Sequence, residues 1–418
     1  MKKFVLGLAA MALIFASCSK DEVTGVNDQN PDVIGFFSST SRATINNLAA
    51  LQSDASGFKV FGTSGSSPSA WYANVAGSNY GFASSAWGWK TTNATWPTVV
   101  ADYPMNFYAM YPATHASVVL SSTYPTVSGA VTIPAAASAQ ADLLAATAST
   151  TTKPGDGKLA LTFKHILSKV NFGIIAGYEK SVIVQTIGVK NVSSKGTYNY
   201  VTGAWSAIGT DAAFDYFRNT TTPFNVTGSD AAETAATPIY TGGAAASANL
   251  MLMPQTHTTW NKSTTVANSY VELIYRLTAT GLPNSIGYTN ATNYLTDYTG
   301  YVDGTDTWGS YTGISTGGTP YGAKPLFIKV GFPMDATSFT WASGKGYTYN
   351  IGLGTLGSCN GFYTDDTYYD ENGDDTGIPI IGPDGTPVEP GDPVSDDILH
   401  FLVNVTDWDD TTAPVVLP

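Results

Sequence analysis

Charged residues are scarce in this chain, where Asp, Glu, Lys and Arg make up 12% of 418 residues. An average globular protein holds about 25%. Acidic residues outnumber basic ones by 32 to 19, and the formal net charge is −13. Binding to nucleic acid depends on clustered Lys and Arg side chains, so the composition argues against a nucleic-acid partner. A polar but weakly ionic surface is typical of exported β-rich proteins instead.

Cysteine is nearly absent as well, since Cys18 and Cys359 are the only two in the sequence. Cys18 ends an apolar segment, and if it is modified there, Cys359 has no partner for an internal disulfide. Stability must then come from the burial of apolar surface, which a chain of this length can supply. An inert small side chain is the expected role of Cys359, and a reactive thiol or an intermolecular bridge is the alternative.

Long hydrophobic runs are missing apart from one at the N-terminus, where residues 4–15 follow Lys2 and Lys3. Such a segment rises about 18 Å as a helix, which is short of the ~30 Å hydrocarbon core of a bilayer. A basic start, a short apolar run and small residues after it predict a secretory signal peptide over residues 1–17. A buried N-terminal helix is the alternative. No other run is long enough to predict a further membrane-spanning segment.

The small residues before Cys18 resemble the lipobox of bacterial lipoproteins, although Phe15 stands where a Leu is usual. This resemblance implies that Cys18 becomes the acylated first residue of the mature protein and anchors it to the outer membrane. Each buried CH₂ of an acyl chain contributes about 0.8 kcal/mol, so several chains hold a protein stably. Residues 18–30 then form a lipidated surface linker, and residues 19–22 resemble the acidic export tag of Bacteroidia-type surface lipoproteins.

Helical periodicity is also scarce, because Gly, Pro, Asn, Asp, Ser and Thr interrupt the chain every several residues. Short alternating apolar runs lie between these turn residues, a pattern typical of antiparallel sandwiches. We therefore predict an all-β protein with few short helices, of which residues 135–146 are the best candidate. The length of the chain indicates two or three domains.

Turn-rich segments divide the chain. Residues 150–157 read TTTKPGDG and are predicted to link an N-terminal sandwich domain, residues 31–152, to a C-terminal one, residues 158–418. Residues 365–397 are rich in Asp, Gly and Pro and are predicted to form an acidic surface loop between the last two strands. Beyond them, alternation predicts a half-buried strand whose apolar face is formed by Leu399, Phe401, Val403 and Val405.

Motifs for catalysis and cofactor binding are incomplete. Residues 352–357 fit G-x-G-x-x-G, but turn residues follow where a dinucleotide site needs a helix. The four histidines form no close pair of metal ligands; they are His115, His165, His257 and His400. Because no convergent set of acid, base and nucleophile is evident, we predict neither an enzyme nor a cofactor.

Two groups of residues are candidates for ligand binding. The carboxylates of Asp370, Asp374 and Asp375 are weak calcium candidates, because calcium prefers hard oxygen ligands. Their spacing is not that of an EF-hand, and a solvated acidic loop is the favoured interpretation. The side chains of Trp87 and Trp89 are candidates for stacking on glycans, although packing in the core is the more common role of such residues.

Five stretches carry motifs that are loose one by one and more specific as an ordered set. They are WP at 96–97 with MNFYAMYP at 105–112, DLLAA at 142–146 with LALTFKHILSKV at 159–170, LMLMPQ at 250–255, GYTYNI at 346–351, and VNVTDW at 403–408. Together they resemble the fimbrillin family of Bacteroidia-type bacteria, in particular its minor-fimbrillin-like branch. The resemblance covers nearly the whole mature chain.

This resemblance implies two tandem transthyretin-like antiparallel β-sandwich domains and no enzymatic activity. It implies an outer-surface lipoprotein that becomes a structural subunit of a fimbria (a type V pilus) or an adhesin associated with it. In such pilins a trypsin-like protease cuts after a basic residue near the N-terminus and removes the lipidated segment together with the first strand. The groove that this exposes then accepts a strand from the next subunit.

The sequence offers candidates for the removed strand and for the cut. Val33, Ile34 and Phe36 are the apolar residues of the candidate first strand, and the bond between Arg42 and Ala43 is the candidate cleavage site. Removing an edge strand leaves unpaired N–H and C=O groups beside an apolar groove, and an added strand from a neighbour satisfies both. Such head-to-tail addition grows filaments. A solvated loop arginine is the alternative interpretation of Arg42.

The C-terminus departs from the family pattern, because only ten residues follow Trp408. Either residues 415–417 or residues 398–405 are then expected to supply the donor strand, and the roles of shaft, tip and anchor subunit all stay open. A monomeric surface lipoprotein that binds glycans is the competing function. The expected partners are other fimbrial subunits, the outer membrane through lipid, and ligands on host or bacterial surfaces.

Overall fold

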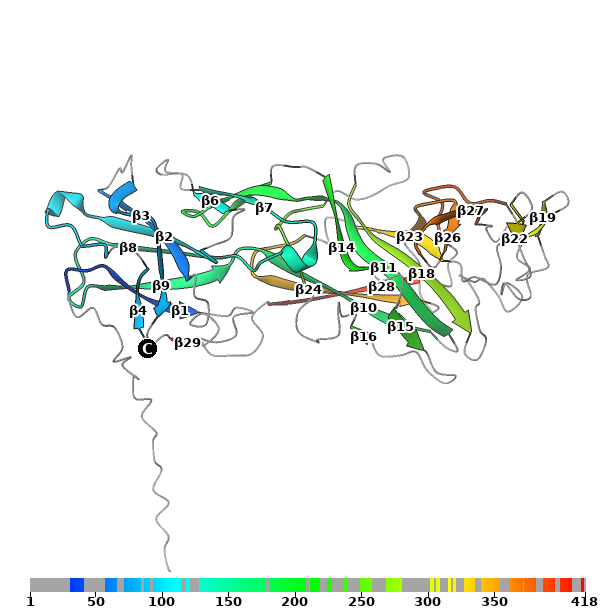
Figure 1. Cartoon of the computed structure of the whole chain (residues 1–418), viewed down its shortest axis with the longest axis horizontal. Coiled ribbons are helices and arrows are strands. Elements are labelled where there is room, and N and C mark those ends of the chain that lie inside the picture. Colours follow the sequence, from blue (N-terminus) through cyan, green and yellow to red (C-terminus); the bar gives the residue numbers. More distant parts are fainter. Residues whose placement is uncertain are drawn as a thin grey trace, which may run out of the picture.

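Strands form nearly all of the regular structure in the computed structural model, and they lie along one long axis (Figure 1). In the described part the helical elements are two single turns of 3₁₀ helix, η1 Val100–Asp102 and η2 Ala137–Ala139. The prediction of an all-β protein is confirmed. That of two tandem transthyretin-like sandwiches stays a prediction.

The structure describes the following residues: 31–40, 57–65, 71–83, 86–90, 93–113, 118–120, 128–177, 180–207, 209, 211–218, 224–227, 237–238, 249–257, 268–279, 301–303, 306–308, 315–316, 319–320, 327–334, 340–353, 361–370, 372–380, 386–394, 399–407 and 415–416. None of the helices in this part is long and apolar enough to cross a membrane.

An eight-stranded sheet lies at the N-terminal end of the long axis, with the strand order β29-β1-β9-β8-β5-β2-β3-β4 (Figure 1). Its strands are β1 Gly35–Thr40, β2 Phe58–Ser64, β3 Trp71–Ala83, β4 Ala86–Trp89, β5 Met105–Tyr111, β8 Leu144–Thr150, β9 Lys158–His165 and β29 Val415–Val416. All described pairings are antiparallel except that of β1 with β9, which is parallel. The first strand and the last described strand of the chain therefore meet in one sheet.

Two further sheets build the other half of the molecule. The first has the order β16-β10-β24-β28, with β17 also paired to β10: β10 Ser168–Ala176, β16 Thr237–Pro238, β17 Leu250–Leu252, β24 Lys345–Leu353 and β28 Leu399–Asp407. The second has the order β14-β11-β18-β23-β25, with β15 also paired to β11: β11 Lys180–Ser193, β14 Asp211–Arg218, β15 Phe224–Thr227, β18 Tyr270–Ala279, β23 Ile328–Pro333 and β25 Phe362–Tyr363. Phe172 of β10 packs edge-on against Tyr216 of β14 across the shared core, so the two sheets form a sandwich.

Smaller sheets complete the description. A four-stranded sheet has the order β13-β12-β7-β6, and its strands are β6 Val118–Leu120, β7 Ser128–Thr132, β12 Lys195–Asn199 and β13 Trp205–Ala207. Three hairpins are formed by β19 Tyr301–Asp303 with β20 Asp306–Trp308, β21 Ser315–Thr316 with β22 Thr319–Pro320, and β26 Thr367–Tyr369 with β27 Asp375–Pro379.

The chain passes from the first sheet to the sandwich between β9 and β10. The connecting residues are fixed by side chains from the second half: Trp205 Nε1 donates to the carbonyl of Ile166 at 2.7 Å, and Ser343 Oγ donates to the same carbonyl at 3.2 Å. The turn-rich residues 150–157, where the sequence predicts a domain boundary, instead connect β8 to β9, which are neighbours in one sheet.

The two hydrophobic cores share a wall, because β5 and the first three residues of β8, 144–146, have both faces buried. In β5, Phe107 and Ala109 belong to the core of the first sheet, whereas Tyr108 and Met110 belong to the core of the sandwich. β8 does the same: Leu144 and Ala146 face the first core, and Ala145 the second, as does Leu143 just before the strand.

This double burial explains why the predicted helix over residues 135–146 is wrong. The structure has one 3₁₀ turn there, and β8 begins at Leu144. Residues 143–146 are buried without interruption, since each face of the strand meets a different core. A short continuous apolar run has no alternation, so its pattern does not distinguish a doubly buried strand from a helix.

The prediction of one long surface loop over residues 365–397 is also wrong. This segment contains the hairpin β26–β27, and Phe327 and Tyr369 exchange main-chain hydrogen bonds of 2.8 and 2.9 Å. Its apolar residues Ile380, Val388 and Val394 are buried in the core of the sandwich. Asp, Gly and Pro are compatible with the turns between such short strands. An overall composition rich in these residues therefore does not reveal the few apolar residues that anchor the segment.

Candidate functional site

The candidate functional site is the seat of β1, which comprises β1, the residues just before it, and their contacts. Of the three apolar residues of the candidate first strand, Phe36 lies in β1, and Val33 and Ile34 lie just before it. β1 runs parallel to β9 in the register Gly35 with Lys158 through Thr40 with Phe163. Ile34, just before β1, and Phe36, within it, belong to the first core and are 0% and 3% exposed, and Val33 is also buried at 9%. Burying each of these contributes about 1.5–3 kcal/mol, so the strand is held mainly by apolar contact.

One edge of β1 is joined to the chain leading into β9. The amide of Gly35 donates to the carbonyl of Gly157 at 2.9 Å, and the indole Nε1 of Trp96 donates to the same carbonyl at 2.9 Å. Gly157 has a φ of +70°, and a Cβ there would lie 2.7 Å from the carbonyl oxygen of Pro31. The close approach of this turn to β1 therefore requires glycine.

The opposite edge of β1 is closed by three different kinds of partner. Just before β1, the amide of Ile34 donates to the carbonyl of Ala94 at 2.8 Å, and its carbonyl accepts from Trp89 Nε1 at 2.8 Å. Within β1, the hydroxyl of Tyr80 accepts from the amide of Phe36 at 3.0 Å and donates to its carbonyl at 3.2 Å. At its end, Thr40 pairs with Val415 of β29. Side chains thus do at Phe36 what a neighbouring strand does in an ordinary ladder.

The ring of Phe36 lies in a pocket of three aromatic side chains. Its centroid is 5.3 Å from that of Tyr80, 5.8 Å from that of Trp89 and 5.2 Å from that of Phe107, all edge-on. Such contacts add about 0.5–1.5 kcal/mol each beyond the burial of area. Phe36 is therefore the main side-chain anchor of β1.

Charge contributes little to the seat of β1. Lys153 Nζ lies 2.5 Å from Asp32 Oδ1, but these side chains are 34% and 71% exposed. An exposed ion pair contributes less than about 1 kcal/mol and is weakened by salt. What the seat recognises is therefore an apolar strand and its main chain.

The residues predicted for lipidation and cleavage, Cys18, Arg42 and Ala43, lie outside the residues that the structure describes. β1 ends at Thr40, two positions before Arg42. A cut after Arg42 would therefore leave the whole of β1 on the removed fragment.

The two tryptophans predicted as glycan contacts belong to β4. The side chain of Trp87 lies outside the described part, and its main chain pairs with Phe82. Trp89 is half-buried and directs its indole N–H at Ile34, so its ring is part of the seat of β1. The sequence does not predict a role for Tyr80, because an alternating strand pattern carries no sign of a partner 44 positions away.

The predicted C-terminal strand is β28. It pairs antiparallel with β24 from Leu399 with Leu353 to Asp407 with Lys345, and it is the last strand in the described order of its sheet. The side chains of its predicted apolar face lie outside the described part; they are Leu399, Phe401, Val403 and Val405.

The acidic calcium candidates make contacts within their own loop. Asp370 is 7% exposed, and its Oδ1 accepts from the amides of Asn372 at 2.8 Å and Asp374 at 3.0 Å. Hydrogen bonds from Gly377 and Thr367 hold the pKa of Asp375 below its usual range. Among the described residues there is no group of three or more His, Cys, Asp and Glu side chains that could hold a metal ion.

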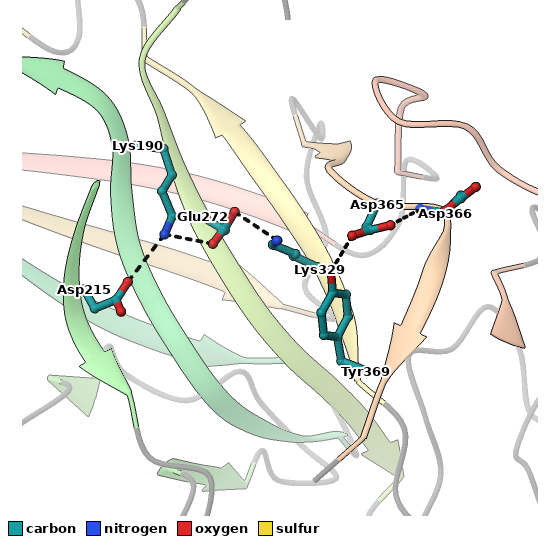
Figure 2. A network of polar contacts seen from close by, with 7 residues as sticks. All are labelled: Lys190, Asp215, Glu272, Lys329, Asp365, Asp366 and Tyr369. Atoms are coloured by element: carbon teal, nitrogen blue, oxygen red, sulfur yellow. Dashed lines mark hydrogen bonds and ion pairs between the residues drawn. The ribbon is translucent and has the colours of Figure 1, made fainter. Parts of the chain in front are cut away.

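A separate polar network joins this acidic segment to the sandwich (Figure 2). The buried carboxylate of Glu272 lies between two ammonium groups, 3.1 Å from Lys190 Nζ and 3.6 Å from Lys329 Nζ. Lys329 also lies over the ring of Tyr369, whose hydroxyl donates to Asp365. Burial, followed by the bond to this carboxylate, raises the pKa of Tyr369. The network fastens β26 to β23, and it gives no sign of a ligand.

The family to which this chain belongs is shown by a sequence match that covers most of its length. The sequence profile of the fimbrillin-like family matches residues 41–364, well over half of the sequence. This chain belongs to the fimbrillin-like family. The predicted resemblance is confirmed, and the fimbrillin-like chain is a fimbrial subunit or adhesin of the cell surface.

Solved structures similar to this fimbrillin-like protein come from species of Bacteroides. A fimbrial protein from Bacteroides vulgatus is 16% identical with a TM-score of 0.49, and the match covers 77% of this chain and 94% of that one. A protein described as a cell adhesion protein, from Bacteroides uniformis, is 14% identical with a TM-score of 0.40, over 91% and 99% of the two chains. A comparison with curated proteins gave no match.

Proposed function

We propose that this fimbrillin-like protein is a structural subunit of a fimbria or an adhesin associated with it, assembled by strand addition after proteolysis removes β1. The observation that carries the proposal is the way β1 is held. Its outer edge is bonded at Phe36 by the hydroxyl of Tyr80 and at Ile34 by the indole of Trp89. At Phe36, exchange of the strand therefore opens a ladder of main-chain hydrogen bonds only on the side of β9.

Removal of β1 would leave a groove suited to a strand from a second subunit. The edge of β9 would lose its parallel partner, and the pockets of Ile34 and Phe36 would lose their occupants. Unpaired main-chain groups beside an apolar groove favour pairing with an incoming strand. Because donor and acceptor are different surfaces, the contact is head-to-tail and grows a filament.

The donor is proposed to come from the C-terminus, as either residues 415–417 or residues 398–405. The pairing of β29 with β1 supports a role for the first of these, because Val416 lies beside Ser39 and Val415 beside Thr40. Loss of β1 would take away the strand beside which this C-terminal segment lies. Cutting would then affect acceptor and donor together.

Export as a lipoprotein is part of the proposal. Acylation of Cys18 would hold the precursor at the outer membrane, and cleavage after Arg42 would release the anchor together with β1. Other fimbrial subunits are the proposed partners, and no catalytic role is proposed. The alternative, a monomeric glycan-binding lipoprotein, has less support because Trp89, one of its two candidate contacts, directs its indole N–H at β1.

The test is replacement of the cleavage residue. An Arg42→Gln variant is expected to stay uncut and monomeric at the cell surface, whereas the unchanged protein begins at Ala43 and runs as a ladder that resists sodium dodecyl sulfate. Mass spectrometry of the N-terminus and gel analysis of surface protein measure both. Arg218→Gln is the control, since it removes another of the three arginines. Ladders from the Arg42→Gln variant, or a mature N-terminus elsewhere, would contradict the proposal.

A further inference from the structure

We propose that Tyr80 and Trp89 form a clamp that binds the main chain of whichever strand occupies the seat of β1, and that sets which strands fit. This inference rests on the proposed function, in which β1 is replaced. It assigns to two side chains the selection of the incoming strand.

The clamp is built to act on main-chain atoms. Its three hydrogen bonds end on the carbonyl of Ile34 and on the amide and carbonyl of Phe36, two residues apart on one strand. The amide of Gly35, the residue between them, points to the other edge and donates to Gly157. Alternate residues of a strand direct their main-chain groups to opposite edges, so the clamp fixes the register of the strand against β9.

The two clamp residues also hold each other through contacts that do not involve β1. Tyr80 and Trp89 are direct cross-strand partners in the pairing of β3 with β4, and their rings pack edge-on with centroids 5.2 Å apart. Tyr80 is 2% exposed and also packs against Phe58 at 5.4 Å. Both residues follow the proposed cut after Arg42 in the sequence, so they stay with the subunit when β1 leaves.

This geometry defines the strand that fits. It must run parallel to β9, it must carry an N–H at the position of Phe36, and it cannot have proline there. An apolar residue is required at the position of Ile34, and an aromatic one is favoured two residues later, because three rings surround that place. Residues 399–401, Leu-His-Phe, have this spacing, whereas residues 415–417 hold no aromatic residue.

The experiment measures how well peptides replace β1. The mature chain, made with Cys18→Ala so that it carries no lipid, is cut once after Arg42 by brief trypsin treatment and checked by mass spectrometry. A labelled peptide of residues 31–42 is then added, and its affinity is measured by fluorescence anisotropy. A second peptide has an ester in place of the amide of Phe36, which removes the N–H that points to Tyr80 and leaves the shape almost unchanged.

The expected result is a coupling between this N–H and the hydroxyl of Tyr80. The ester is expected to weaken binding to the unchanged protein about fivefold, the effect of one hydrogen bond, and to make little difference in a Tyr80→Phe variant. Trp89→Phe keeps an aromatic ring and should weaken both peptides equally, because its N–H binds Ile34. Tyr103→Phe is the matched control: its hydroxyl donates to the carbonyl of Pro97 at 3.4 Å, away from β1, and it should behave like the unchanged protein.

The failures of the clamp and of the proposed function are distinguishable. Suppose that both peptides replace β1 and that the ester weakens binding to the Tyr80→Phe variant as much as binding to the unchanged protein. The clamp is then overturned, and the replacement of β1 by another strand stands. If no peptide replaces β1 in any protein, the proposed function fails. Hydrogen exchange in the uncut chain then tests whether the clamp exists. Faster exchange of the Phe36 amide in Tyr80→Phe but not in Tyr103→Phe supports the clamp, and the same exchange rate in both variants overturns it.

Discussion

At the scale of single residues, the seat of β1 depends on side chains whose roles follow from one contact each. Phe36 is an anchor because three rings surround it, and Trp89 is a main-chain donor because its N–H meets the carbonyl of Ile34. The sequence offers Phe36 only as an apolar residue of a candidate first strand, and the structure places this side chain in β1 with 3% exposed. For Trp89 the sequence suggests stacking on glycans or packing in the core, and it does not predict the bond to Ile34, because a strand pattern does not say which atoms an indole N–H will reach.

Replacement of Gly157 is expected to loosen β1. Its φ is +70°, and a Cβ at this residue would lie 2.7 and 2.9 Å from the carbonyl oxygens of Pro31 and Val33, so Gly157→Ala strains the main chain beside the strand. The expected loss is about 1–3 kcal/mol in the free energy of unfolding, measured with urea. Gly155→Ala is the control, because a Cβ there would meet nothing within 4 Å. Equal stability of the two variants would contradict this account.

Acid is expected to destabilise the protein through His257. This side chain is 3% exposed, its Nδ1 lies 3.1 Å from Ser269 Oγ, and burial lowers its pKa from 6.5 to about 4. Between these two pKa values the unfolded chain binds a proton that the folded protein does not. Stability is therefore complete above about pH 6.5 and falls as the pH drops to 4, by up to about 3 kcal/mol.

The measurement for His257 is urea unfolding at several pH values. A His257→Gln variant is less stable at pH 7 but lacks this part of the pH dependence, so its free energy of unfolding changes less between pH 6.5 and 4. A slope identical to that of the unchanged protein would show that other groups cause the acid effect.

At the scale of elements, the sequence predicts strands with one buried face and misses a strand with two buried faces. β9 has one buried face and reads as an alternating strand, with the apolar residues Leu161 and Phe163 turned inward. The start of β8, residues 144–146, has both faces buried, and the sequence around it predicts a helix. The family motif DLLAA coincides with this doubly buried stretch, and the motif LMLMPQ ends in Gln255, whose side chain bonds the main chain of Ser193 at 2.8 and 3.3 Å.

The docking of β26 on β23 is expected to depend on a buried charge. Glu272 is 6% exposed and lies between Lys190 and Lys329 (Figure 2). Glu272→Gln removes the carboxylate that these two ammonium groups share and leaves Lys190 with Asp215 at 3.4 Å. The expected loss is about 1–3 kcal/mol in the free energy of unfolding. Urea unfolding checks this, together with hydrogen exchange of the Tyr369 amide, which should speed up.

The control for this charge is Lys153→Gln, which breaks the exposed pair with Asp32. It should cost less than about 1 kcal/mol, and high salt should reduce that effect. A loss for Glu272→Gln as small as that for Lys153→Gln would show that the network does not fasten the segment.

At the scale of the whole molecule, the shared wall of β5 and β8 is expected to make both cores unfold together. Phe172 is fully buried in the core of the sandwich, far from the seat of β1 in the sequence. A Phe172→Ala variant should lose about 3–5 kcal/mol, and hydrogen-exchange protection of β2, in the other core, should fall by the same amount as that of β18.

Val201→Ala is the control for the shared wall, because this side chain is 51% exposed and its loss should change neither region. The contrary outcome is protection of β2 that is unaffected by Phe172→Ala. The two cores would then be independent units, as the boundary predicted near residues 150–157 implies.

The sequence by itself determined the all-β class and the family, because alternation of apolar residues and ordered motifs are local properties of a chain. The tertiary structure decided which groups close the edges of that strand. Tyr80 meets Phe36 across 44 positions, and Trp89 meets Ile34 across 55. Local pattern fixes which face of a strand is buried, but the partner of its edge is fixed only when distant segments pack together.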